Sequence, residues 1–217
     1  MPDLEFAVEG AEAIPHAAIP LLALKLRVKN AQSDEEIHSI MLRCQVQIEP
    51  ARRNYSAAEK EKLFDLFAEP ARWARTVRPL LWMNTSISVP GFTCSTLVEL
   101  QLPCSFDFNV ATTKYFYALQ TGEIPVTVLF SGTVFYRGGT DNLQVAQVPW
   151  NREAGCRVPV ELWKRLMDQH YPNAVFLELS RDAFERLYAY KVRHGIPTWE
   201  RVVAKLLPAE ETSEVEV

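Results

Sequence analysis

The strongest constraint on the fold of this chain is a strict alternation of apolar and polar residues over thirteen positions. The even positions hold Val98, Leu100, Leu102, Cys104, Phe106, Phe108 and Val110, whereas the odd positions hold Glu99, Gln101, Pro103, Ser105, Asp107 and Asn109. A period of two residues is that of a β-strand with one buried face. Because this run exceeds the usual strand length, we expect it to bend or break near Pro103.

Similar patterns recur along the first two thirds of the chain and predict about seven strands. The expected strands cover residues 4–8, 22–29, 38–48, 81–89, 98–110, 124–136 and 143–150. Short polar connections favour antiparallel pairing. Gly132 indicates a bulge or a close approach of two backbones, and Gly138 with Gly139 indicates a turn. The predicted fold class is α+β, an antiparallel sheet of about seven strands with helices packed on it.

Helical spacing occurs in an insertion between two strands and again in the last third of the chain. The insertion covers about residues 56–78 and begins with a capping box of Ser56 and Glu59. Further helices are expected over residues 112–120 and from Pro159, Ser180 and Thr198, with a short strand at residues 174–179. We predict a single domain over residues 1–207 and an acidic, disordered tail at residues 208–217.

The composition indicates an acidic globular protein. Of 217 residues, 48% are hydrophobic, and the net charge is −4. We expect no nucleic-acid partner, because phosphate contacts require clustered Lys and Arg. One basic stretch, Arg72, Arg75 and Arg78 around Trp73, is interpreted as a solvated helix face. The sequence has no signal-peptide pattern and no apolar run that could span a membrane, so we expect a cytoplasmic protein without membrane insertion.

Cys156 is the strongest candidate for a reactive side chain. Gly155 would leave it accessible, Arg157 would favour its thiolate, and the helix that follows would add a positive dipole end. No histidine is close in the sequence, so an ordinary loop cysteine is the alternative interpretation. Cys44 and Cys104 fall on apolar strand positions and are expected to be small buried residues.

No other pattern predicts catalysis or a bound cofactor. The histidines lack metal-ligand spacing, and His38 falls on an inward strand position, where it would be a buried core residue. Glu99 and Asp107 lie on the polar side of a strand, and the glycines match neither a dinucleotide site nor a phosphate loop. We therefore predict no catalytic residue, no metal site and no cofactor.

Aromatic residues provide the best functional lead. The candidate binding surface consists of Tyr115, Tyr117, Phe130, Phe135, Tyr136 and Trp150. Phe135 and Tyr136 are adjacent in one expected strand and must point to opposite faces. Either helices or a partner subunit cover both faces of the sheet, which we favour, or one face exposes an apolar groove.

Three stretches of the chain resemble an uncharacterised bacterial domain family over nearly the full length, to about Leu207. They are LPCSFDFNVATTKYFYALQTGEIPVTVLFSGTVFYRG at residues 102–138, VAQVPWNREAGCRVPVELWKRLMDQHYPN at residues 145–173, and PTWE at residues 197–200. Genes of this family often lie beside those for nickel–iron uptake hydrogenases. The resemblance implies no known activity and supplies no catalytic residue.

A weaker resemblance of layout is to the export chaperone SecB. It is carried by the succession of antiparallel strands, by an aromatic-proline turn at Tyr171-Pro172 after a helix, and by a last helix that begins near Phe184. This resemblance implies exposed apolar grooves that bind unfolded or partly folded proteins.

Three functional hypotheses follow. The first is a non-enzymatic protein-binding or assembly factor, chaperone-like and acting on a hydrogenase-related client. The second is a small-molecule or thiol-dependent enzyme with a site near Cys156. The third is a structural subunit whose aromatic faces form a homo-oligomer. The expected partner is accordingly a protein client or a second subunit.

Overall fold

The structure, a computed structural model, describes residues 2–31, 35–105, 109–138 and 142–207. The chain divides into two compact units, Met1–Ala174 and Val175–Val217. The sequence patterns do not mark this boundary, and the single domain expected over residues 1–207 stays a prediction. The expected tail at residues 208–217, together with Phe106, Asp107, Phe108 and Gly139, lies outside the described residues.

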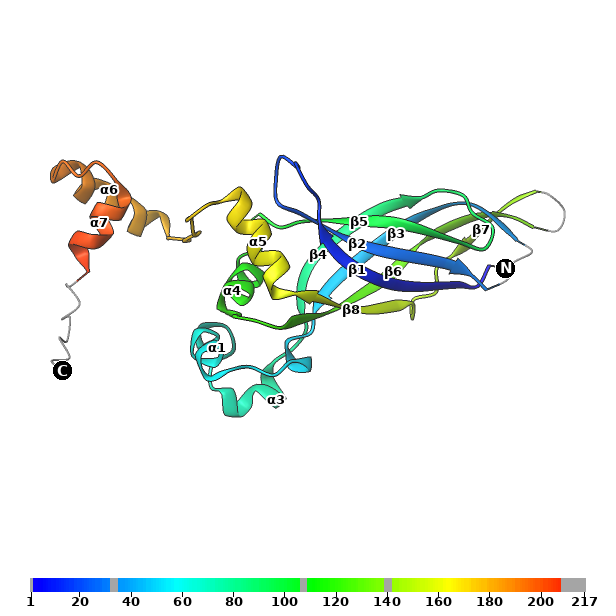
Figure 1. Ribbon diagram of the computed structural model, residues 1–217, viewed down its shortest axis with the longest axis horizontal. Helices are drawn as coiled ribbons and strands as arrows, with labels where there is room; N and C mark the ends of the chain where they lie inside the picture. Colours follow the sequence, from blue (N-terminus) through cyan, green and yellow to red (C-terminus); the bar gives the residue numbers. More distant parts are fainter. Residues whose placement is uncertain (1, 32–34, 106–108, 139–141, 208–217) are drawn as a thin grey trace. The chain divides into compact units, whose positions relative to one another are not determined.

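The first unit contains eight strands among its described residues, and they form two antiparallel sheets (Figure 1). The strands are β1 (Leu4–Ala13), β2 (Leu21–Asn30), β3 (Glu36–Ile48), β4 (Leu80–Val89), β5 (Ser95–Pro103), β6 (Glu123–Arg137), β7 (Leu143–Gln147) and β8 (Glu153–Pro159). Sheet A has the order β1-β2-β5. Sheet B has the order β4-β3-β6-β7, and β8 also pairs with β6.

The two sheets bury their apolar faces against each other. Sheet A contributes Leu22, Leu24, Leu26, Leu100 and Leu102, and sheet B contributes Ile40, Leu42, Cys44, Val126 and Val128. Phe6 of β1 stacks on Phe130 of β6 with ring centroids 4.3 Å apart, so the contact crosses between the sheets. The alternation in β5 therefore points its even residues into a shared core, and the strand ends at Pro103 as expected.

The α+β class and the antiparallel pairing are confirmed, but the strands form two sheets and not one. Each sheet has one face that consists mainly of buried apolar side chains, and two such faces can cover each other without a layer of helices. The sequence analysis also missed β8. Its seven residues include Gly155 and end at Pro159, two residue types that are typical of loops and strand ends.

The expected inward position of His38 is wrong. The pairing of β3 with β6 shifts register between Ile37 and Ser39, which is the signature of a β-bulge. Ile37 consequently lies in the core, whereas His38 is exposed. The inward alternation resumes at Ile40 and continues to the end of the strand.

The helices of the first unit gather at one end of the two sheets and do not cover a sheet face (Figure 1). The insertion between β3 and β4 contains α1 (Ala57–Lys62), α2 (Phe64–Phe67), α3 (Trp73–Thr76) and the 3-10 turns Pro50–Arg52 and Pro70–Arg72, and it is followed later by α4 (Val110–Ala118) and α5 (Val160–His170). The ring centroid of Phe116 in α4 lies 4.9 Å from that of Trp82 and 5.1 Å from that of Trp163. These buried aromatic rings close that end of the core.

The second unit consists of α6 (Arg181–Arg193) and α7 (Trp199–Leu206) among its described residues. The hydroxyl groups of Ser180 and Thr198 accept hydrogen bonds at the two helix starts, as the sequence predicts. The rings of Phe184, Tyr188 and Trp199 lie within 6.3 Å of one another. The short strand expected at residues 174–179 is wrong, because these described residues are not in a strand. None of the described helices is long and apolar enough to cross a bilayer.

Candidate functional site

The outer face of sheet A carries charges that neutralise one another. Three cross-strand ion pairs join β1 to β2, namely Glu5 with Lys29, Glu9 with Arg27 and Glu12 with Lys25. The hydrogen bond from Arg27 holds the pKa of Glu9 below its usual range. Paired charges of both signs are typical of a face in contact with water.

The outer face of sheet B has a different composition. We define its central part by these side chains, which point away from the core on β3, β4, β6 and β7: Met41, Arg43, Gln45, Asn84, Ser86, Ser88, Leu129, Ser131, Thr133, Phe135, Val145 and Gln147. The exposed residues Glu36 and Arg137, at the ends of β3 and β6, lie outside this set. Arg43 is the one charged residue of this set. The other side chains are hydroxyl, amide, sulfur-containing, aliphatic or aromatic.

Two adjoining hollows, of 670 and 490 Å³, lie on this face. Arg43, Ser86 and Ser131 line both of them, so the hollows form one groove. The strand register explains the shape, because the short side chains of Ser86 and Ser131 flank the long side chain of Arg43 on either side. Gly132 adds a position with no side chain in the larger hollow.

Arg43 takes part in no ion pair with any described residue of the chain. Its guanidinium offers five donors in a planar fork that matches a carboxylate. Met41 is 57% exposed and lines the larger hollow, and Trp150 is 92% exposed and lines the smaller one. The groove therefore combines one free cation with two apolar contact points.

The six predicted surface residues separate into two groups. Tyr115, Phe130 and Tyr136 are buried, so the prediction that they line an exposed surface does not fit the structure. Their rings fill the core, where Tyr115 and Phe130 contact other aromatic residues and the hydroxyl of Tyr136 donates to Gln144.

The other three predicted residues remain accessible. Phe135 lies on the outer face of sheet B and Trp150 lines its groove, so the structure brings these two to one side of the molecule. Tyr117 lies on α4, where the ammonium group of Lys62 is 5.8 Å from its ring. The sequence analysis did not select Arg43 and Met41 as binding-surface residues. Both lie on the polar side of β3, where Arg43 is the one charged residue beside Met41, Gln45 and Gln47, and this pattern could have identified them.

Cys156 does not have the environment expected of a reactive thiol. It lies inside β8, opposite Val126, and not in a loop. Burial raises its pKa to about 11, and the side chain of Arg157 points to the other side of the strand, where it is 3.9 Å from Glu123. The expected stabilisation of the thiolate is therefore wrong. Cys44 and Cys104 are buried as predicted, and burial raises the pKa of each to about 12.

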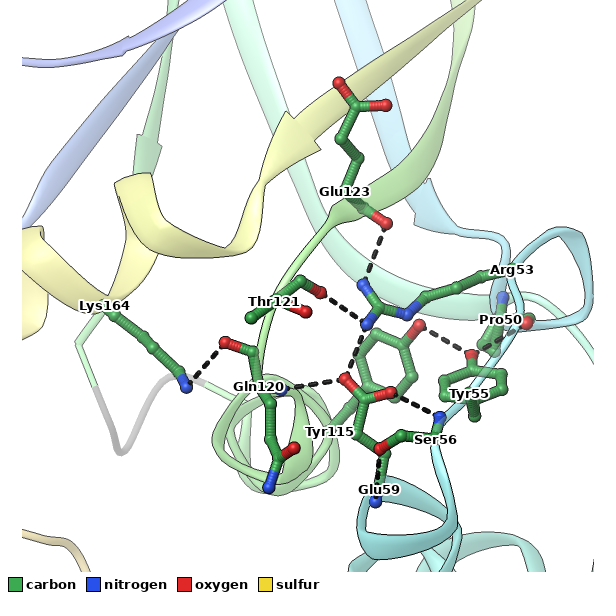
Figure 2. Close-up of polar contacts among 10 residues, drawn as sticks. All are labelled: Pro50, Arg53, Tyr55, Ser56, Glu59, Tyr115, Gln120, Thr121, Glu123 and Lys164. Atoms are coloured by element: carbon green, nitrogen blue, oxygen red, sulfur yellow. Dashed lines mark hydrogen bonds and ion pairs between the residues drawn. The ribbon is translucent and has the colours of Figure 1, made fainter.

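A second polar cluster joins the start of the insertion to α4 and β6 (Figure 2). Arg53 and Glu59 form an ion pair of 2.6 Å, and both side chains are less than 10% exposed. Arg53 also donates to the carbonyl oxygens of Thr121 and Glu123 at 2.7 and 3.0 Å. Glu59 accepts from the backbone N–H groups of Ser56 and Gln120 at 2.9 and 2.8 Å. The capping box predicted from Ser56 and Glu59 is present within this cluster.

Most polar groups of this cluster are hydrogen-bonded to one another, whereas the buried Nε of Arg53 has no hydrogen-bond partner among the described residues. Burial tends to raise the pKa of Glu59, but the N–H groups of Gln120 and Ser56 and the charge of Arg53 outweigh it and hold the pKa below its usual range. The hydroxyls of Tyr55 and Tyr115 lie 2.8 Å apart, and burial raises the pKa of both. We interpret the cluster as a clamp that holds the insertion in place.

Among the described residues, no group of three or more His, Cys, Asp or Glu side chains is placed to hold a metal ion. A family model described as a family of unknown function (DUF6084) matches residues 1–215. No curated protein and no solved structure match the chain. The match covers the same region as the resemblance to an uncharacterised domain family.

Proposed function

The chain belongs to the DUF6084 family of unknown function, and we propose that it is a non-enzymatic protein-binding or assembly factor that uses the outer face of sheet B. The observation that carries this proposal is the open groove around Arg43, which has an unpaired guanidinium at its centre and Met41 and Trp150 along it. The outer face of sheet A is a less favourable binding surface, because a charged partner would have to compete with the existing ion pairs between β1 and β2.

The composition of the groove favours a protein over a small molecule. Protein interfaces are depleted of charged residues at their centre and enriched in aromatic residues, Met and Arg. The hydroxyl and amide groups of Ser86, Ser131 and Gln147 can exchange water for the peptide groups of a partner. We propose a partner that presents a carboxylate to Arg43 and apolar side chains to Met41 and Trp150.

The finer features of the proposal are a chaperone-like action and a hydrogenase-related client. An open, shallow groove can accept segments of varied sequence, which suits a protein that contacts unfolded or partly folded clients. The hydrogenase association rests on the resemblance alone.

The proposal is tested by quantitative affinity capture from the native host with the full chain. Arg43→Glu and Trp150→Ala are compared with Arg165→Glu on α5 and Leu97→Ala on the outer face of sheet A, which are exposed residues of the same kinds elsewhere. The expected result is one or more partners that both groove variants lose by at least about tenfold and both control variants retain. A partner that presents its carboxylate to Arg43 should also dissociate as the salt concentration rises.

Further measurements separate the proposal from its alternatives. The chaperone-like action predicts that the wild-type chain slows aggregation of the captured client and that Arg43→Glu does so less. If the captured protein binds all four variants equally, the groove is not the binding site. If Arg43→Glu instead changes only the mass of the chain in solution, the face joins copies of the chain, and the structural-subunit hypothesis replaces this one.

A further inference from the structure

A separate hollow of 500 Å³ lies against the helical insertion, away from the residues of the proposed groove. Its apolar lining comes from α2, from the end of α3 and from the start of β4, and consists of Phe64, Leu66, Phe67, Val77 and Leu80. Phe64 is 56% exposed, whereas Val77 is buried beneath the surface. A volume of this size falls within the roughly 300–1,000 Å³ that is typical of small-molecule sites.

Two arginines add positive charge to this hollow. Arg72 and Arg78 both line it, and neither takes part in an ion pair with a described residue. One carboxylate, that of Asp65, is also part of the lining, but it is held by the ammonium group of Lys114 at 2.6 Å. The charge left without a partner in the hollow is therefore positive.

Phe67, which lines the hollow, belongs to a cluster of packed aromatic rings. Trp73 contacts Tyr55 at 5.4 Å and Phe67 at 5.5 Å between ring centroids, with the rings nearly perpendicular in each case. Its indole N–H donates to the carbonyl oxygen of Ala68 at 3.0 Å. Ala68 has φ 57° and ψ −143°, a backbone conformation that residues other than glycine rarely adopt and that is enriched at functional sites.

We propose that this hollow binds a small amphiphilic acid, with its carboxylate on the guanidinium groups of Arg72 and Arg78 and its apolar body on Phe64, Phe67 and Val77. The charge selects an anion, because each guanidinium can donate two parallel hydrogen bonds to a carboxylate. The apolar lining selects a ligand that carries a hydrocarbon or aromatic group and disfavours a free inorganic anion. The basic stretch around Trp73 is thus a ligand site and not only a solvated helix face.

The chain contains a matched control for this site. Arg75 belongs to the same basic stretch and lies in α3, between the two lining arginines in the sequence, but it is not part of the lining of the hollow. Replacing Arg75 by Gln removes the same charge from the insertion as replacing either lining arginine. A difference between the variants therefore reports the geometry of the site and not the overall charge.

The test is isothermal titration of the full chain with octanoate, acetate and 1-octanol. We expect saturable binding of one octanoate per chain, at least tenfold weaker binding of 1-octanol, and no saturable binding of acetate. The Arg72→Gln/Arg78→Gln double variant should lose at least tenfold in octanoate affinity, and each of the single variants Arg72→Gln and Arg78→Gln at least threefold. Arg75→Gln, which removes the same charge as either single variant, should stay within twofold of wild type. Because all three arginines are exposed, the variants should fold normally, which circular dichroism checks.

Several outcomes would overturn the proposal. These are a wild-type chain that does not bind octanoate saturably, an Arg75→Gln variant that weakens binding as much as the double variant, and 1-octanol binding as tight as that of octanoate. The site is independent of the groove on sheet B, so Arg43→Glu should bind octanoate like the wild type. Loss of octanoate binding in Arg43→Glu would place the acid in the groove and contradict this assignment.

Discussion

At the scale of single residues, Gly132 lies where the backbone of β6 closely approaches that of β3. A Cβ atom there would be 2.1 Å from the carbonyl oxygen of Met41, and the φ of Gly132 is 150°. Both the contact and the dihedral exclude a side chain. A glycine within an otherwise apolar strand predicts a bulge or a close approach of two backbones. The structure confirms the close approach.

We predict that Gly132→Ala lowers the free energy of unfolding by about 2–4 kcal/mol through backbone strain and overlap with Met41. Gly155→Ala in the neighbouring β8 is the control, because a Cβ atom there would meet its nearest atom at 4.0 Å. Urea unfolding of both variants measures the difference. Equal stability of the two variants would contradict the close approach.

The cysteines provide a second prediction at this scale. Cys94 is exposed, whereas burial raises the pKa of Cys156 to about 11 and that of Cys44 and Cys104 to about 12. Because only the thiolate reacts, iodoacetamide at pH 8 should modify Cys94 at least about tenfold faster than the other three in the native protein. Mass spectrometry of the digested protein measures each rate. Modification of Cys156 at the rate of Cys94 would restore it as a candidate nucleophile.

At the scale of elements, the Arg53–Glu59 pair connects the insertion to the start of β6. The pair is buried, and each partner would remain as an unpaired buried charge if the other were removed. Lys114 and Asp65 form an ion pair of the same length, but both of their side chains are more than half exposed. The two pairs therefore differ in burial and not in distance.

We predict that Glu59→Gln destabilises the protein by about 3 kcal/mol, because it leaves the charge of Arg53 buried without a counterion. Asp65→Asn should cost less than about 1 kcal/mol, because water screens the exposed pair. Urea denaturation at pH 7 compares the two variants. A loss of similar size in both would show that the Arg53–Glu59 cluster is not the clamp of the insertion.

The same carboxylate predicts a dependence on pH. The pKa of Glu59 is held below its ordinary value, so its contribution is fully present above the pKa of an unfolded glutamate, about 4.3. The contribution is lost as the pH falls through the lower pKa of the folded state. The gap in stability between wild type and Glu59→Gln should therefore shrink below about pH 4, and a gap that grows in acid would contradict the assigned direction.

At the scale of the whole molecule, almost the entire buried core belongs to the first unit. Val202 is the one residue of the second unit among the buried hydrophobic residues that are described. The second unit exposes apolar side chains on both of its helices, including Phe184, Tyr188 and Val192. The stability of the sheets is thus expected to be independent of α6 and α7.

We predict that a chain ending after Ala174 still unfolds cooperatively, with a midpoint temperature within about 5 °C of the full chain. Hydrogen exchange of the full chain should show slow amide exchange in β3 and β6 and faster exchange in α6 and α7, because helices of this length with little burial open readily. Loss of cooperative unfolding in the shortened chain would show that the second unit completes the core.

Local periodicity was sufficient to predict seven of the eight strands, four of the helix starts and the capping box at Ser56, because these depend on neighbouring residues. Periodicity failed at His38. A β-bulge there changes the face of the sheet to which the side chain points, and the neighbouring sequence does not indicate the bulge. Periodicity also failed for β8, whose pairing with β6 depends on a strand that is distant in the sequence. The sequence favoured covered faces but did not indicate that Tyr115, Phe130 and Tyr136 in particular would be buried, because residue type alone does not distinguish an aromatic core from an aromatic surface.

The sequence by itself determined the α+β class and the antiparallel strands, because alternation and capping act over a few residues. Only the tertiary structure decided that one apolar face would cover another and leave the strand with Met41 and Arg43 open on its polar side. The physical reason is that exposure depends on what packs from elsewhere in the chain. The alternation within a strand indicates which of its sides is apolar, and the sheet that packs against that side leaves the polar side of β3 exposed.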